Sequence, residues 1–246
     1  NKEIKKLSIL NEKDFVRAKE TIQFIKDRKW NSALKSSSKV KDSEFRNLIN
    51  WMYLKTTRNG ASFAEYKNFI EKNSDYPRIN RIRFLAEEKI YLRNNSPTSI
   101  INWFDKYPPL GGIGKIKLAE AYLEQGQEDK VLSLIKEGWE TAAISKNDLG
   151  YYRAKFKKYI DSEDHIKRAD YLAWEKKYWD LKRMLKYLPS DQRALYNARQ
   201  ILMSNSYGVD NAISKVPQYL KEDPGLEFDR LRWRNRRGRL EGSLEI

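Results

Sequence analysis

The fold is decided by residues 123–139, which read LEQGQEDKVLSLIKEGW. A helix that ends in the polar run around Gly126 is followed within a few residues by an apolar stripe. The stripe has the spacing i, i+3, i+4, i+7 and i+8 and consists of Val131, Leu134, Ile135, Gly138 and Trp139. Apolar residues at this spacing cover one face of an α-helix. The stretch therefore predicts two helices joined by a tight bend.

The same local pattern recurs along the chain. A first helix ends in a basic or polar run, and a second helix begins on an apolar stripe, at residues 26–34, 174–181 and 233–240. The distances between these bends are irregular, so the chain has no strict repeat. Helix pairs of this kind bury their apolar faces only against their neighbours, as in an α-solenoid.

The period of 3.6 residues extends over almost the whole sequence, and strict alternation is nearly absent. We predict an all-α protein, an irregular TPR-like α–α superhelix of helical hairpins that curves into an arc or partial ring. We expect residues 1–246 to form one superhelical domain. The helices are expected at roughly 12–28, 30–40, 43–58, 62–73, 78–94, 97–106, 112–125, 128–146, 149–159, 163–176, 178–187, 191–205, 208–221 and 225–246, the last with a break near Gly238. Ser62 and Glu65 have the spacing of a capping box.

Composition narrows the chemistry. The 246 residues include 49 Lys and Arg, 34 Asp and Glu, one histidine and no cysteine, for a formal charge of +15. Without cysteine there is no disulfide, thiolate metal site or cysteine nucleophile, and one histidine excludes a two-histidine metal site. The charge predicts a polyanionic partner, which could be nucleic acid, an anionic membrane face or an acidic cell-wall polymer. No apolar run is long enough to span a bilayer.

Few residues have the pattern of a reactive site. Adjacent acidic pairs such as Glu87-Glu88 point in different directions on a helix, so they do not converge. Glu87 and Glu120 lie within apolar stretches, and we expect each to be a buried structural acid paired with a cation. His165 is expected to be a hydrogen-bonded structural residue. Residues 111–114 contain three glycines but follow two prolines rather than a strand, so we interpret them as a turn and not as a phosphate-binding loop.

The strongest candidate binding feature lies in the helix that begins at Pro224. It is the densest positive charge in the chain and comprises Arg230, Arg232, Arg234, Arg236, Arg237 and Arg239. We interpret this arginine strip as a candidate anion-binding, glycan-binding or domain-docking surface; the alternative is a solvated face of the solenoid. Most of the seven tryptophans fall on apolar stripes, which favours core packing over stacking on sugars or bases.

Two segments of the second half carry a resemblance to a known family. Residues 164–174 read DHIKRADYLAW, and residues 223–238 read DPGLEFDRLRWRNRRG. They resemble the DHxxRxDxLLW and DPGLxxxRxRWRRxKG stretches in the long α-superhelical region of the soluble lytic murein transglycosylases. Asn235 and Arg237 depart from the commoner Arg and Lys of that pattern.

The resemblance implies a periplasmic protein of a Gram-negative bacterium. The family that it resembles cleaves the β-1,4 bond between N-acetylmuramic acid and N-acetylglucosamine in peptidoglycan and forms 1,6-anhydro products. The catalytic glutamate of the family sits in a Glu-Ser motif of a lysozyme-like domain, and no Glu-Ser dipeptide occurs in this sequence. We therefore expect a superhelical scaffold that ends before the linker and catalytic domains. Such a scaffold has no catalytic residue, cofactor or metal of its own. Its implied partners are glycan strands and its own catalytic domain, and not nucleic acid.

Two other functions fit the same helix pairs. A TPR-like adaptor would bind a protein partner in its concave face. An RNA-binding α-solenoid would use the positive charge and the aromatic residues.

Overall fold

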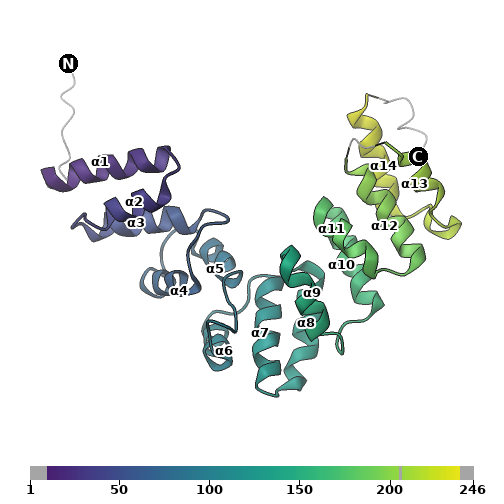
Figure 1. Cartoon of the computed structure of the whole chain (residues 1–246), viewed down its shortest axis with the longest axis horizontal. Helices are drawn as coiled ribbons and strands as arrows, with labels where there is room; N and C mark the ends of the chain where they lie inside the picture. Colours follow the sequence, from purple (N-terminus) through teal and green to yellow (C-terminus); the bar gives the residue numbers. More distant parts are fainter. Residues whose placement is uncertain (1–9, 205–206, 239–246) are drawn as a thin grey trace. The chain divides into compact units, whose positions relative to one another are not determined.

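A computed structural model describes residues 10–204 and 207–238, and this part of the chain contains fourteen α-helices and no strand (Figure 1). The helices are α1 (Glu12–Lys26), α2 (Trp30–Ser37), α3 (Ser43–Leu54), α4 (Phe63–Lys72), α5 (Ile79–Glu87), α6 (Pro97–Lys106), α7 (Gly112–Glu124), α8 (Val131–Thr141), α9 (Lys146–Lys155), α10 (Ser162–Trp174), α11 (Tyr178–Met184), α12 (Ser190–Leu202), α13 (Val209–Ser214) and α14 (Pro224–Arg236). Within each unit most consecutive helices pack on one another, most extensively α7 on α8 and α1 on α2. The all-α architecture of helical hairpins is confirmed.

The helices fall into two compact units, one that ends at Ile90 and one that begins at Tyr91. The first unit contains α1–α5, and its fully buried residues include Ala33, Ile49 and Ile82. The second unit contains α6–α14 around one continuous apolar core, which extends from Ile113 to Leu226. The expectation of a single domain over the whole chain stays a prediction.

One residue at each of the four bends has a left-handed backbone. These residues are Arg28 (φ 58°), Gly126 (φ 70°), Lys176 (φ 57°) and Gly238 (φ 68°). Glycine adopts this conformation without strain, whereas a residue with a Cβ is strained by about 1 kcal/mol. Each of the four bends therefore contains a left-handed residue, although that residue is glycine at only two of them.

Helix ends follow the local capping chemistry. The capping box of Ser62 and Glu65 starts α4 as predicted. The helix expected at 149–159 instead begins at Lys146, because the side chain of Ser145 accepts a hydrogen bond from the amide of Asp148. The helix expected at 208–221 is limited to α13, which ends at Ser214 shortly before Pro217. Proline cannot donate the next helical hydrogen bond and disfavours helical backbone before it.

The glycines near the start of α7 allow a close helix contact. A Cβ on Gly112 would lie 2.6 Å from the backbone nitrogen of Ala142, and one on Gly138 would lie 2.9 Å from the carbonyl oxygen of Gly112. Only glycine fits at this crossing of α7 and α8. Gly111 is the N-cap residue of α7, and residues 112–114 form the first turn of that helix. The interpretation of residues 111–114 as a turn between helices is therefore wrong for all but Gly111, because the helix begins directly at Gly112.

Within the described residues, no helix combines the length and the apolar character needed to cross a membrane.

Candidate functional site

The predicted arginine strip lies along α14 and just beyond it. Arg230, Arg232 and Arg234 are partly buried, Arg236 and Arg237 are exposed, and Arg239 lies outside the described residues. Arg232 packs its guanidinium carbon 5.5 Å from the ring centre of Phe228. Arg237 packs in the same way, 4.6 Å from the ring centre of Trp233. These cation–π contacts orient the two guanidinium groups along the helix.

Arg236 has a structural role within the strip. Its Nη1 donates to the carbonyl oxygen of Met203 at 3.0 Å, and its Nη2 donates to that of Leu202. The last carbonyls of a helix have no partner within the helix, so Arg236 caps the C-terminus of α12. Arg232, Arg236 and Lys176 also line a cavity of about 100 Å³. The carboxylate of Asp229 lines this cavity as well, so an anion would meet charges of both signs, and the anion-binding role of the strip stays a prediction.

Arg199 of α12 does not belong to the arginine strip and is fully buried, with 0% of its surface exposed. Its Nη1 is 2.7 Å from Oδ1 of Asp170 on α10, and its Nε is 2.9 Å from Oδ2 of Asp229 on α14. Asp223, at the start of α14, lies 3.9 Å away. A buried guanidinium is stable only when it is paired and hydrogen-bonded, so these carboxylates tie three helices together. Burial raises the pKa of the Asp229 carboxyl above its usual value, and Arg199 opposes that rise.

The Asp-Pro-Gly segment is built around this arginine. Asp223 caps α14 by accepting a hydrogen bond of 2.8 Å from the amide of Leu226. A Cβ on Gly225 would lie 2.5 Å from Nη2 of Arg199 and closer still to its Cζ and Nη1 atoms. Gly225 is therefore required so that the guanidinium can lie against the first turn of α14.

The segment at 164–174 also joins helices. Arg168 is buried, and its Nη2 donates to the carbonyl oxygen of Ala142 at 2.9 Å while its Nη1 donates to that of Trp139. Arg168 thus caps the C-terminus of α8 from α10. Lys136 of α8 in turn forms ion pairs at the start of α10. Its Nζ lies 2.9 Å from Oδ2 of Asp161 and 2.5 Å from Oδ2 of Asp164.

His165 has the structural role that its sequence context predicts. Its Nδ1 accepts a hydrogen bond of 3.3 Å from Nε1 of Trp139. Burial, and then the charge of Arg153, lower the pKa of His165 below its ordinary value. The neutral imidazole that accepts this hydrogen bond is therefore favoured.

Glu120 is buried and paired, as predicted. Its Oε1 accepts a 2.5 Å hydrogen bond from the hydroxyl of Tyr151 and lies 3.6 Å from Nζ of Lys155. Glu87 is also buried. Neither acid belongs to a cluster of metal-ligand type, since no group of three or more His, Asp or Glu residues that could hold a metal ion occurs among the described residues.

Lys117, which no sequence pattern indicated, is buried beside Glu120 on α7. Its Nζ lies 3.8 Å from the ring centre of Tyr91 and 5.2 Å from that of Tyr152. Burial lowers the pKa of Lys117 to about 8. Tyr91 and Tyr152 also line a cavity of about 300 Å³ with Arg93, Glu120 and Asp148. The sequence does not lead us to expect a buried Lys117, because lysine is rarely buried. The apolar neighbours Ile116 and Leu118 are a local signal of burial at this position.

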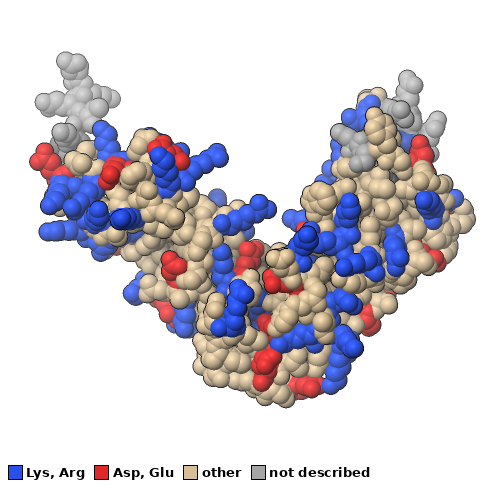
Figure 2. Space-filling view, viewed as in Figure 1, with Lys and Arg blue, Asp and Glu red and all other residues tan. Residues whose placement is uncertain are grey.

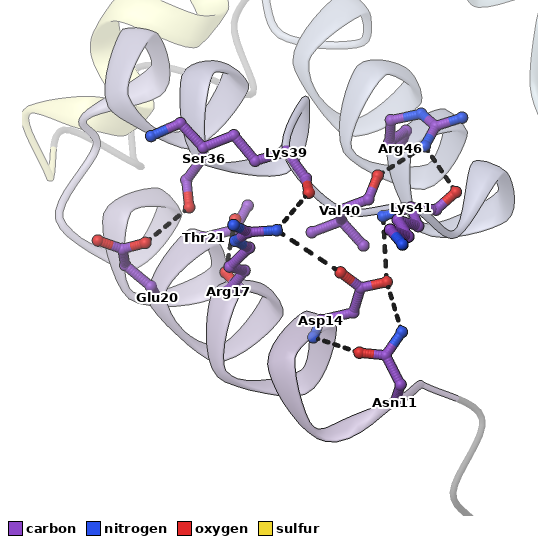
Figure 3. A network of polar contacts seen from close by, with 10 residues as sticks. All are labelled: Asn11, Asp14, Arg17, Glu20, Thr21, Ser36, Lys39, Val40, Lys41 and Arg46. Carbon is purple, nitrogen blue, oxygen red and sulfur yellow. Dashed lines mark hydrogen bonds and ion pairs between the residues drawn. The ribbon is translucent and has the colours of Figure 1, made fainter.

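In the first unit, a polar network joins α1 to the turn between α2 and α3 (Figure 3). The buried carboxylate of Asp14 accepts hydrogen bonds from the amide of Lys41 at 3.1 Å and from the side chain of Asn11 at 3.0 Å. Arg17 donates to the carbonyl oxygen of Lys39 at 2.7 Å, and Arg46 donates to those of Val40 and Lys41 at 2.6 and 2.7 Å. Arginines that bind backbone carbonyls thus recur in both units, at a turn in the first and at helix ends in the second.

Charge is spread over the surface of each unit. Figure 2 shows Lys and Arg side chains across the visible face of both units, with Asp and Glu among them. Trp139 and Trp103 are core residues, as predicted, whereas Trp179 is 63% exposed. Lys182 lies 5.4 Å from the ring centre of Trp179. Trp179 is thus an aromatic face on which a sugar ring could stack.

No family model matches the chain, and neither a curated protein nor a solved structure matches it.

Proposed function

We propose that this chain is a non-catalytic superhelical scaffold of a periplasmic lytic transglycosylase, the protein class that its sequence resembles. In this role the helices position a catalytic domain and guide glycan strands of peptidoglycan, and the chain itself cleaves no bond. Its charge of +15 suits a place beside an acidic wall polymer.

One observation carries the proposal. Residues of the two family-like segments join helices in the second unit: Arg168 caps α8, and Asp170 and Asp229 both bind Arg199 of α12, which lies beside Gly225. A family-like pattern whose side chains join helices supports a scaffold role, because these contacts stabilise the packing of the helices. The proposal is consistent with the absence of a Glu-Ser dipeptide from the sequence.

Wall binding tests the proposal through the arginine strip. Arg230 and Arg232 form no hydrogen bond or ion pair with other described residues, and the one ring contact of the pair is that of Arg232 with Phe228. We therefore expect their neutralisation to leave the helices folded, which circular dichroism checks. We expect Arg230→Gln/Arg232→Gln to weaken co-sedimentation with purified peptidoglycan sacculi at low salt. The charge-matched control is Lys146→Gln/Lys157→Gln, at two exposed lysines of the same unit.

The control pair should sediment like the unmodified chain. Equal losses in both variants would mean that only net charge matters. A chain that never sediments with sacculi at low salt would contradict the proposal. Binding to single-stranded RNA in place of sacculi would favour the RNA-binding alternative.

A further inference from the structure

A polar groove of about 410 Å³ lies in the first unit between α3 and α4. The two helices that flank it have few contacts with each other, since α4 packs mainly on α5. The polar side chains that line it from the two helices are Arg46, Asn47, Asn50, Glu65, Asn68 and Lys72. On α3, Asn50 follows Arg46 by four residues and Asn47 by three. On α4, Glu65, Asn68 and Lys72 are spaced by three and four residues. Each set therefore shares one face of its helix. The end of α2 contributes Ser37 and Ser38.

Three asparagines of the groove have unused hydrogen-bonding groups. The side-chain amides of Asn47, Asn50 and Asn68 form no hydrogen bond with any residue in the described ranges. Each amide has two donor hydrogens and an acceptor oxygen. Asn59 of the same unit differs, because its amide donates to the carbonyl oxygen of Thr56 at 2.9 Å. The groove thus presents a row of amides that the protein itself does not use.

The net charge of the side chains that line the groove is positive, since Arg46 and Lys72 outnumber Glu65. Glu65 keeps its negative charge but is held at the start of α4, where its Oε2 accepts hydrogen bonds of 2.8 Å from both the amide and the hydroxyl of Ser62. Lys72 has no ion-pair partner among the residues that the structure describes. Arg46 uses only Nη1 to hold the carbonyls of Val40 and Lys41, which leaves its other N–H groups for a ligand (Figure 3).

The aromatic residues of the groove do not offer a stacking surface. Tyr53 and Phe69 line it, yet both are buried. Sugar rings and nucleic-acid bases are bound largely by stacking on exposed aromatic faces. The groove therefore favours a ligand that is recognised by hydrogen bonds and charge.

We propose that this groove binds an extended acidic peptide segment. A peptide group has one N–H donor and one C=O acceptor, which is the complement of a side-chain amide, and an extended strand repeats it at regular intervals. Asn47, Asn50 and Asn68 would pair with the backbone of the peptide, and Lys72 and Arg46 would face its carboxylates. The partner is thus a protein with an acidic, unfolded segment, and this role goes beyond wall binding by the second unit.

Fluorescence anisotropy tests the proposal. The probe is a labelled peptide of about eight alternating Glu and Thr residues with both ends blocked, in which Thr favours extended backbone and Glu supplies the carboxylates. We expect saturable binding that weakens with salt. Asn50→Ala and Asn68→Ala should each weaken it about fivefold, the value of one net hydrogen bond. Lys72→Ala should weaken it and reduce its salt dependence.

Matched controls separate the groove from the rest of the unit. Asn31→Ala and Lys35→Ala change residues of α2 that do not line the groove, and both should bind the probe normally. A probe whose backbone amides are N-methylated at alternate residues should lose binding. It keeps all of its carboxylates but lacks the backbone N–H donors at the methylated residues. Helicity by circular dichroism should be equal in all variants.

Any of four results would overturn the proposal. They are an absence of saturable binding at low salt, equal losses in the α2 controls, full affinity for the N-methylated probe, and displacement of the peptide by N-acetylglucosamine oligosaccharides. The last result would assign the groove to glycan instead.

Discussion

Gly225→Ala is the most direct probe of the buried arginine in the second unit. The new Cβ would lie 2.5 Å from Nη2 of Arg199 and closer still to Cζ and Nη1. Ordinary contact needs roughly 3.4 Å or more, so the guanidinium must move by about 1 Å. That movement breaks hydrogen bonds of 2.7 Å to Asp170 and 2.9 Å to Asp229.

The size of the effect follows from two opposing contributions. Disruption of a buried ion pair costs about 3–5 kcal/mol. Replacement of a helical glycine by alanine returns about 0.5–1 kcal/mol. We therefore expect Gly225→Ala to lower the free energy of unfolding by about 3 kcal/mol.

Urea denaturation, followed by tryptophan fluorescence, measures this loss. Gly150→Ala in α9 is the matched control, because a Cβ there meets nothing within 4 Å. The control should be stabilised by about 0.5–1 kcal/mol, the opposite sign. In an Arg199→Met background, Gly225→Ala should lower the free energy of unfolding by much less, since the flexible thioether side chain can move aside. A Gly225→Ala protein as stable as the unmodified chain, or an undiminished cost in the Arg199→Met background, would refute this account of the Asp-Pro-Gly segment.

Three further predictions concern single positions. Lys176→Gly should raise the free energy of unfolding by about 1 kcal/mol, because φ of 57° strains a residue with a Cβ; an unchanged urea midpoint would contradict this. The lowered pKa of His165 means that the unfolded chain takes up a proton first as the pH falls below about 6.5, so stability should drop there. His165→Gln should lack that component of the decline, as pH-dependent urea midpoints would show. Lys117→Met should be neutral or stabilising by about 1 kcal/mol at neutral pH, since it removes a buried ammonium; a large loss in thermal unfolding would mean that the contacts with Tyr91 outweigh desolvation.

Helices and bends could be predicted from the sequence because their signals are local. The apolar stripe at residues 131–139 and the polar run before it lie within a few turns of each other. Helix boundaries were less well predicted, since they depend on which residue caps the helix. Ser145 and Pro217 shifted two of them by several residues. The left-handed residues Arg28 and Lys176 carry no local signal, because arginine and lysine rarely adopt that backbone.

The candidate sites depend on contacts between distant residues. Arg199 meets Asp170 and Asp229, which are about thirty residues away on either side, and no local pattern marks an arginine as buried. The arginine strip was identified by charge density, yet density alone does not show that Arg236 is used to cap α12. The asparagines of the groove were missed because Asn50 and Asn68 come together only when α3 packs beside α4.

In the scaffold role that we propose, this chain supports wall chemistry without performing it. The most direct measurement is mass spectrometry of soluble muropeptides after incubation of the purified chain with sacculi. We expect the chain to be retained on the sacculi and no 1,6-anhydro muropeptide to be released. Release of 1,6-anhydro muropeptides by this chain alone would contradict the proposal that it is a non-catalytic scaffold.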